Sequence, residues 1–353
     1  MAHMIESEDV VLTAIGDSRA WHGLDKQVDF QTFDWIREAF GYRVDVKNLH
    51  TALGALDAYG LISERAPSKL LRLCPSDAVV DQPADVARFA ERLNNSVGGR
   101  IVSALTLEHT ARLAICIELP DTITDLGNGD RISKYVVVTG SYDGSHPWRV
   151  QFWTMRAVCN NTLPSATMED GYIWSARNGK GERFSMQLAD KIAGIIRAIP
   201  AERMRKENDI YAGLTTANID PLRDVNRFAQ LIAEDGGKVL HRIIQLDPDM
   251  RGASLLDRCL VATIDQSAWM SVRAADMSPL GRKIVVNTLE GMGADLGTAR
   301  NTAWGLLNAA TQSFDHDSKR DRQDQLSSQM FQEFRGEKQN ALLLASALAN
   351  TSW

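Results

Sequence analysis

The sequence lacks the features that mark several large classes of protein. Its four cysteines lie far apart in 353 residues and form no Cys-x-x-Cys pair. This spacing argues against a zinc site or a disulfide framework and favours a reducing cytoplasm. No apolar run reaches the roughly 18 residues expected of a membrane span, and the start lacks the basic and apolar pattern of a secretion signal. We therefore expect a cytoplasmic protein with no membrane partner.

Other absences narrow the chemistry. Neither Gly-x-x-x-x-Gly-Lys-Ser/Thr nor Gly-x-Gly-x-x-Gly occurs in the chain, so ATP-driven chemistry and a bound cofactor are not expected. Asp and His residues show no metal-ligand spacing, and Asp315-His316-Asp317 reads as a charged surface turn rather than a metal site. The net charge of −6 argues against a general coat of positive charge for nucleic acid, but it is compatible with a local basic groove.

The pattern of apolar residues predicts an α+β protein with three regions. Residues 1–80 read as an irregular N-terminal segment, 81–215 as an α+β core, and 216–353 as a mostly helical C-terminal region. The last prediction rests on residue pairs such as Asp220-Pro221 and Ser278-Pro279, because an N-cap residue followed by proline marks the start of a helix.

The core region is predicted to be an antiparallel β-meander packed on a long amphipathic helix. A helical apolar stripe covers 184–199 and ends at Pro200. The expected strands alternate in polarity and are joined by segments too short for helical crossovers. Residues 121–130 are expected to be a loop. The four expected strands are 100–106, 111–119, 133–140 and 148–158.

The fourth expected strand carries the most informative tract of the sequence. Because successive side chains alternate between faces, Trp148, Val150, Phe152 and Thr154 share one face and read as core. A solvent-facing row on the other face would suit single-stranded nucleic acid, since bases stack on aromatic rings and cations follow the phosphates. In the alternative interpretation, the tryptophan of this row packs under a helix and its arginine pairs with an acid. The row consists of Arg149, Gln151, Trp153 and Met155.

A basic stretch follows the expected strands. Between Arg177 and Asp209, eight cations outnumber five acids in a chain that is acidic overall. Lys180 lies between two glycines, on a flexible tip that would reach a phosphate backbone. The alternative is an ordinary solvated helix face. The cations are Arg177, Lys180, Arg183, Lys191, Arg197, Arg203, Arg205 and Lys206.

The fourth strand ends in Arg156 and the run Cys159-Asn160-Asn161-Thr162. Asn and Thr side chains bond to nearby backbone groups, which favours a structural corner between strand and helix. A nucleophilic Cys159 would need a base, and no His lies near it in the sequence. No catalytic residue is predicted, and a non-enzymatic protein is favoured.

These landmarks resemble a family of uncharacterised phage- and plasmid-borne proteins, known as a domain of unknown function. The resemblance implies a mobile-element gene product in a bacterial cytoplasm, with DNA as the partner class and no established activity. At the level of fold, the order of elements is similar to that of phage single-strand annealing recombinases of the Redβ, RecT and Erf groups. Those proteins form rings or filaments and hold single-stranded DNA without ATP. The matching pieces are Trp21-His22-Gly23-Leu24, Asp143-Gly144-Ser145, Arg156 to Leu163, Asn301 to Ala309 and Asp315-His316; Asp25 departs from the expected glycine.

Three hypotheses of function follow. In the first, an oligomer binds and anneals single-stranded DNA in a groove between the sheet and the long helix, with cations on phosphates and a ring against bases. In the second, a phage protein binds a host or phage protein, as an anti-restriction or replication accessory factor, through acidic residues between 315 and 337. The third is a metal-dependent nuclease. The predicted DNA-binding residues are Arg149, Trp153, Arg156, Lys180, Arg183, Lys191 and Arg197.

Overall fold

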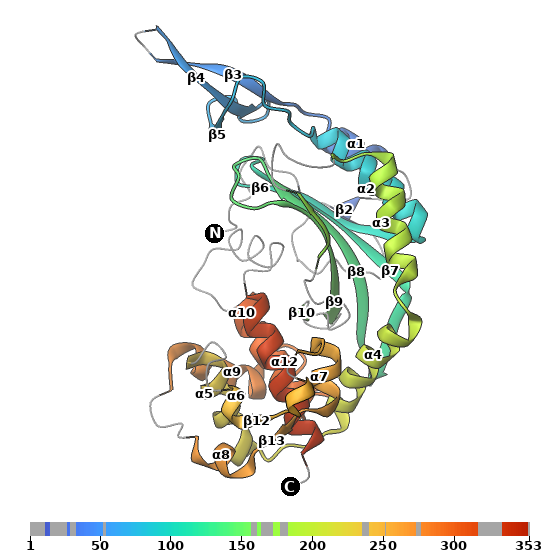
Figure 1. Ribbon diagram of the computed structural model, residues 1–353, viewed down its shortest axis with the longest axis vertical. Coiled ribbons are helices and arrows are strands. Elements are labelled where there is room, and N and C mark those ends of the chain that lie inside the picture. The colour runs from blue at the N-terminus through green and yellow to red at the C-terminus, as the bar shows by residue number, and fades with distance from the viewer. Residues whose placement is uncertain are drawn as a thin grey trace.

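The computed structural model shows an α+β protein (Figure 1). An antiparallel sheet with helices on one face occupies the middle of the chain, and a helical region follows it. The fold class predicted from the sequence is confirmed. The residues described by the structure are 11–14, 27–28, 33–51, 54–156, 161–163, 172–176, 183–234, 240–250, 252–272, 277–316 and 334–351.

The main sheet has the strand order β10-β9-β8-β7-β6-β1-β2, with β11 also paired to β9. Neighbouring strands are antiparallel except β1 and β2, which are parallel. The four central strands follow one another in the chain, so the predicted meander is confirmed. The strands are β1 (Val11–Ala14), β2 (Gln27–Val28), β6 (Arg100–Leu107), β7 (Arg112–Gly127), β8 (Asp130–Ser141), β9 (Trp148–Arg156), β10 (Asn161–Leu163) and β11 (Tyr172–Ala176).

The segment 121–130 is not the predicted loop. Strand β7 continues to Gly127, and β8 begins at Asp130. The connection is the two-residue turn Asn128-Gly129, where both residues have positive φ angles, 54° and 77°. An Asn-Gly pair favours this turn because both residues tolerate the left-handed backbone that matches the twist of a hairpin. The threonines at 122 and 124 continue the alternation of a strand whose second half reaches solvent.

Residues 44–74 form a second, separate sheet, so the expectation of an irregular N-terminal segment is wrong there. Its three antiparallel strands are β3 (Val44–Thr51), β4 (Gly54–Ser63) and β5 (Leu70–Cys74), in that order. Figure 1 shows this sheet projecting from one end of the molecule, beyond the short helix α1 (Asp34–Ala39). We call residues 44–74 the β3–β5 arm.

Two helices cover one face of the main sheet. Helix α2 (Pro83–Val97) begins with a capping box formed by Gln82 and Asp85. Helix α3 (Met186–Ala198) begins at Ser185, whose hydroxyl accepts a hydrogen bond from the Leu188 backbone N–H. Their apolar sides form one cluster with the facing strand residues, which confirms the predicted packing of a long amphipathic helix on the meander. After Pro200 the chain continues as α4 (Ala201–Thr216).

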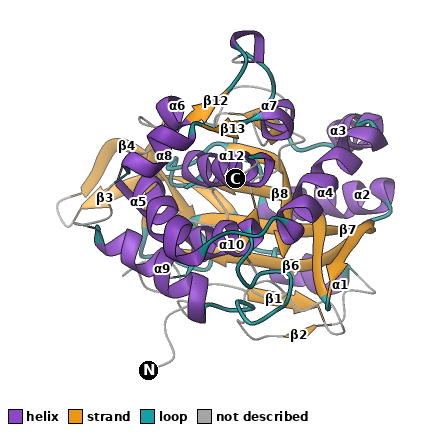
Figure 2. Ribbon diagram, turned by 90° about the horizontal axis from the view of Figure 1, so that it is seen from below, coloured by secondary structure: helices purple, strands orange, loops and turns teal. Residues whose placement is uncertain are grey.

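The chain after α4 is mostly helical, as predicted, and has its own apolar core. Helix α10 is buried along its whole length, and Figure 2 shows α10 and α12 with the other helices of this region around them. Within the described residues, no helix combines the length and the apolar character needed to cross a membrane. The elements are η1 (Pro221–Val225), α5 (Asn226–Glu234), α6 (Leu240–Ile243), β12 (Ile244–Gln245), η2 (Pro248–Met250), α7 (Leu255–Val261), β13 (Thr263–Ile264), α8 (Gln266–Ser271), α9 (Pro279–Glu290), α10 (Ala303–Asp315) and α12 (Arg335–Asn350).

Candidate functional site

Strand β9 alternates as predicted, but both of its faces are buried. Trp148, Val150 and Phe152 belong to the cluster under α2 and α3. On the opposite face, Trp153 belongs to a second apolar cluster and is 0% exposed. Its indole N–H donates to the Gln151 side chain over 3.4 Å. The prediction that Trp153 faces solvent is therefore wrong, because the second face of the sheet is covered as well, and its ring is not placed to stack on a base.

Arg156 is also buried and cannot reach a DNA phosphate from its position. It makes a two-pronged ion pair with Asp130, with N–O distances of 2.7 and 2.6 Å, and both side chains are 0% exposed. Trp304 and Thr298 donate to the same carboxylate over 2.9 and 2.8 Å. Burial acts to raise the pKa of Asp130, but the hydrogen bonds and charge of Arg156 outweigh it, and the pKa lies below its usual value. The predicted DNA contact is thus a structural ion pair.

A second buried ion pair lies beside Thr154, two residues before Arg156 on β9. Lys134 of β8 contacts Glu207 of α4, and both side chains are 1% exposed. Thr154 completes the group, since it accepts from Lys134 over 2.9 Å and donates to Glu207 over 2.7 Å. Burial lowers the pKa of Lys134, while the charge of Glu207 opposes that shift.

A third pair corrects the interpretation of Asp315-His316-Asp317. Asp315, at the end of α10, is 2% exposed and contacts Lys338 of α12. It also accepts hydrogen bonds from the Thr162 backbone N–H and hydroxyl, over 2.9 and 3.0 Å. Asp315 therefore does not lie in a charged surface turn. Residues 317–333 lie outside the described residues. They include Asp317 and most of the acidic stretch up to Glu337.

The three pairs show where the landmark motifs meet. Arg156 stands 5.4 Å from the Trp304 ring, and Thr162 reaches Asp315. The first contact joins the end of β9 to α10, and the second joins β10 to α10. The two longer motifs, 156–163 and 301–309, therefore converge at the junction between the main sheet and the helical region. We call this group of three buried ion pairs the sheet–helix junction.

The groove predicted between the sheet and the long helix is filled. Leu188, Ile192 and Ile196 of α3 are buried in the same apolar cluster as Val136 and Val150 of the sheet. This packing is favourable because each Å² of apolar area that is removed from water contributes about 25 cal/mol of transfer free energy. DNA has no path between these two layers.

The predicted cations outside the core lie on different parts of the molecule. Arg149 is half-buried on the face of β9 opposite to α3. Arg183 binds Asp81 over 3.1 Å and the Val80 carbonyl over 2.9 Å. Lys191 and Arg197 are exposed on α3. Lys180 and Cys159 lie outside the described residues. The predicted set is therefore not brought together at a single site.

The structure does place five cations on α3 and α4, four of them exposed and Arg203 half-buried. The two helices run end to end along one edge of the molecule (Figure 1). Their sequence contains five cations and four acids, but Glu207 is turned inward to Lys134 and leaves the surface. Asp190 is held by Arg92 of α2 over 2.8 Å. We call the following residues the α3–α4 cations: Lys191, Arg197, Arg203, Arg205 and Lys206.

The partners of the α3–α4 cations are few. Arg203 and Arg205 have no ion-pair partner among the described residues. Arg197 donates to the Ser96 backbone carbonyl over 3.3 Å, which leaves its charge without an acid in that contact. Lys206 pairs with Glu202 at 3.1 Å on the helix surface, a contact worth only a few tenths of a kcal/mol. The guanidinium groups of Arg203 and Arg205 are therefore open to an anionic partner.

The cysteines and the metal-binding residue types give less evidence of a functional site. Within the described residues, no three His, Cys, Asp or Glu side chains cluster in a way that would hold a metal ion. Burial raises the pKa of Cys259 to about 12, so its thiol is a poor nucleophile at neutral pH. Cys116 is buried too.

Some residues of the sheet–helix junction carried a signal in the sequence. Lys134 has the same strand parity as Val136 and Val138, and Arg156 has the same parity as Val150 and Phe152. Alternation alone therefore places both cations on the core face. Alternation alone does not identify their acid partners, because Asp130 begins β8 within a segment expected to be a loop and Glu207 lies 73 residues from Lys134.

Comparison with known proteins gives one match. A family model described as a domain of unknown function (DUF932) matches residues 79–347, which is more than half of the chain. This range contains the main meander, the sheet–helix junction and the α3–α4 cations, whereas the β3–β5 arm precedes it. No curated protein and no solved structure matches the chain.

Proposed function

We propose that this chain, which belongs to the family described as a domain of unknown function (DUF932), binds single-stranded DNA through the phosphate backbone. We place it among mobile-element proteins of the bacterial cytoplasm, acting as an oligomer that anneals strands without ATP. The observation that carries the proposal is the set of α3–α4 cations. One acid of these helices is turned into the core, and a second is paired with α2.

The physical scheme relies on charge rather than on a stacking ring. Cations on phosphates release condensed counterions, and this supplies most of the free energy of sequence-independent binding. Trp153 is buried, so bases stay free of that ring and their edges remain available for pairing with a second strand. The preference for single strands rests on the order of elements, since helix, hairpin, further antiparallel strands and long helix resemble the annealing recombinases.

A salt titration tests the scheme. Fluorescence anisotropy with a labelled single-stranded oligonucleotide gives the dissociation constant at several salt concentrations. The variant Arg197→Gln/Arg203→Gln/Arg205→Gln should bind more weakly. The plot of log K against log salt should become less steep, its slope decreasing in magnitude by about 2, because each phosphate contact contributes about 0.7. The matched control Arg242→Gln/Arg300→Gln removes two exposed cations from the C-terminal region and should leave the slope unchanged.

Three results would overturn this proposal. The first is an absence of binding at low salt. The second is equal slopes for the triple variant and the parent, and the third is stronger binding to a duplex of the same sequence. An annealing assay with two complementary labelled strands then separates simple binding from annealing.

Association with a second copy is supported by the β3–β5 arm. Within the part of the chain that the structure describes, strand β5 pairs only with β4, and its Leu70 and Leu73 are 44% and 65% exposed. A free strand edge with apolar side chains is a site for pairing with another chain. Light scattering of the parent should give an oligomer, and Leu70→Ser/Leu73→Ser should shift it toward the monomer. A monomeric parent, or an unchanged oligomer in the variant, would contradict this role.

A further inference from the structure

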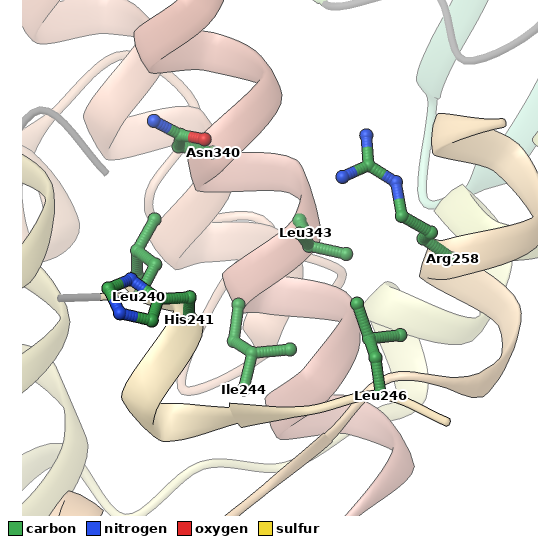
Figure 3. A pocket seen from close by; sticks show the side chains of 7 residues that line it. All are labelled: Leu240, His241, Ile244, Leu246, Arg258, Asn340 and Leu343. Carbon is green, nitrogen blue, oxygen red and sulfur yellow. The ribbon is translucent and has the colours of Figure 1, made fainter. Parts of the chain in front are cut away.

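The helical region contains a cavity that the proposed DNA site does not use. Its volume is about 350 Å³, which is in the range of small-molecule sites. Four apolar side chains line much of it, contributed by α6, β12, the chain after β12, and α12 (Figure 3). These are Leu240, Ile244, Leu246 and Leu343.

Polar groups from three helices reach the same cavity. They are His241 of α6, Arg258 of α7 and Asn340 of α12. Figure 3 shows Arg258 on one side, Leu240 and His241 on the other, and the two α12 residues between them. An apolar wall with a few convergent polar groups is the common composition of a ligand site.

Arg258 is the residue that points to the charge of the ligand. Its Nε is buried and has no hydrogen-bond partner within the described residues. Among the described residues that line the cavity there is no Asp or Glu to balance the guanidinium. Elsewhere in the chain the buried cations Arg156, Lys134 and Lys338 each have an acid in contact. Arg258 is half-buried, and a guanidinium that lines an apolar cavity without an acid beside it in the described residues favours an anionic group.

We propose that this cavity binds a small organic carboxylate with an apolar body, of the size of a six-carbon acid or benzoate. The planar guanidinium of Arg258 takes the carboxylate in a two-pronged contact. Asn340 adds an amide donor, and the leucine and isoleucine side chains cover the apolar body. The site lies in the helical region, so this inference is independent of DNA binding by the α3–α4 cations.

Isothermal titration of the full chain tests the proposal with hexanoate, benzoate, 1-hexanol and inorganic phosphate as probes. Hexanoate or benzoate should bind, whereas hexanol lacks the charge and phosphate lacks the apolar body, so each should bind at least about tenfold more weakly. Arg258→Met should weaken carboxylate binding by about tenfold or more. Arg258→Lys keeps the positive charge and should retain part of the affinity for the carboxylate.

The control is Arg242→Met, which removes an exposed arginine that lies next to His241 in the chain and does not line the cavity. It should bind the carboxylates as the parent does. Circular dichroism verifies that each variant is folded. The proposal is overturned if neither carboxylate binds at millimolar concentration, if hexanol binds as well as hexanoate, or if folded Arg258→Met keeps the parent's affinity.

Discussion

The two interfaces of the main sheet are closed by different chemistry. Between the sheet and the helices α2 and α3, the contact is apolar, and residues such as Ile192, Val136 and Val150 meet in one cluster. The sheet–helix junction contains three buried ion pairs. One joins β9 to β8, one joins β8 to α4, and one joins α12 to α10, whose Asp315 also contacts Thr162 of β10. One interface excludes water, and the other matches individual charges.

This difference has a consequence for specificity. An apolar interface loses free energy gradually when its side chains shift or shrink. A buried ion pair adds little net stability over an apolar pair, but removing one partner is costly because the other charge stays buried. We therefore expect the junction to fix how the helical region sits on the sheet, and the apolar layer to supply most of the stability.

Removal of one charge at the junction should have the largest effect. Asp130→Asn leaves Arg156 buried without a counter-charge, and a guanidinium does not lose its proton. We expect the free energy of unfolding to fall by about 4 kcal/mol, measured by urea denaturation. The control is Asp125→Asn on the same hairpin, whose contact with Arg131 is 4.0 Å long and exposed; it should cost under about 0.5 kcal/mol. Equal losses in the two variants would contradict the comparison.

Truncation in the apolar layer should have the next largest effect. Ile192 of α3 is 1% exposed, and Ile192→Ala should lower the free energy of unfolding by about 3 kcal/mol, through lost transfer free energy and a cavity. Ile195 lies on the same helix and is 39% exposed. Ile195→Ala should therefore cost less than about 1 kcal/mol. Similar losses at both positions would show that α3 does not pack as described.

The Lys134–Glu207 pair should respond to pH when its acid is removed. Burial already lowers the pKa of Lys134, and Glu207→Gln removes the charge that opposes this shift. The folded state then binds fewer protons than the unfolded state between the lowered pKa and the ordinary value of 10.5. In that window the free energy of unfolding should rise with pH, by up to about 1.4 kcal/mol per unit.

At pH 7, Glu207→Gln should cost about 2 kcal/mol, which is less than Asp130→Asn because a lysine can neutralise itself by losing a proton. Urea denaturation at pH 7, 8 and 9 checks both statements. Parallel pH profiles for the variant and the parent would mean that the Lys134 pKa does not depend on Glu207.

The smallest effect is expected at Trp304. Trp304→Phe keeps most of the ring but removes the N–H that donates to Asp130 over 2.9 Å. The loss should be about 1 to 2 kcal/mol, as for a hydrogen bond to a charged acceptor. A double-mutant cycle with Asp130→Asn isolates this bond. If the two losses add without a coupling energy, Trp304 contributes only its packing.

Local patterns in the sequence predicted much of the fold. The meander, the long helix ending before Pro200 and the helical C-terminal region are present. The Asn128-Gly129 pair is itself a hairpin signal, and the segment 121–130, expected to be a loop, contains the end of β7 and the start of β8. The β3–β5 arm was not predicted. The central strand β4 contains two glycines and two alanines, so its strand propensity is weak, and it is stabilised by pairing with β3 and β5.

The candidate site was predicted only in part. The basic stretch around α3 and α4 follows from composition, but its charge at the surface depends on Glu207 turning inward to Lys134. Trp153 was predicted to bind DNA because its strand face was expected to meet solvent. Alternation shows which residues share a face, and it does not show what covers that face. No sequence pattern pointed to Arg258, whose cavity partners come from separate helices.

The sequence by itself therefore determined the local elements, since strand alternation, helical stripes, caps and prolines act over a few residues. The tertiary structure decided which charges are buried and which are exposed. Asp130 meets Trp304 across 174 residues of chain, and Lys338 meets Thr162 across 176. Such contacts depend on how whole elements pack, and a buried charge is tolerated only where that packing brings it a partner.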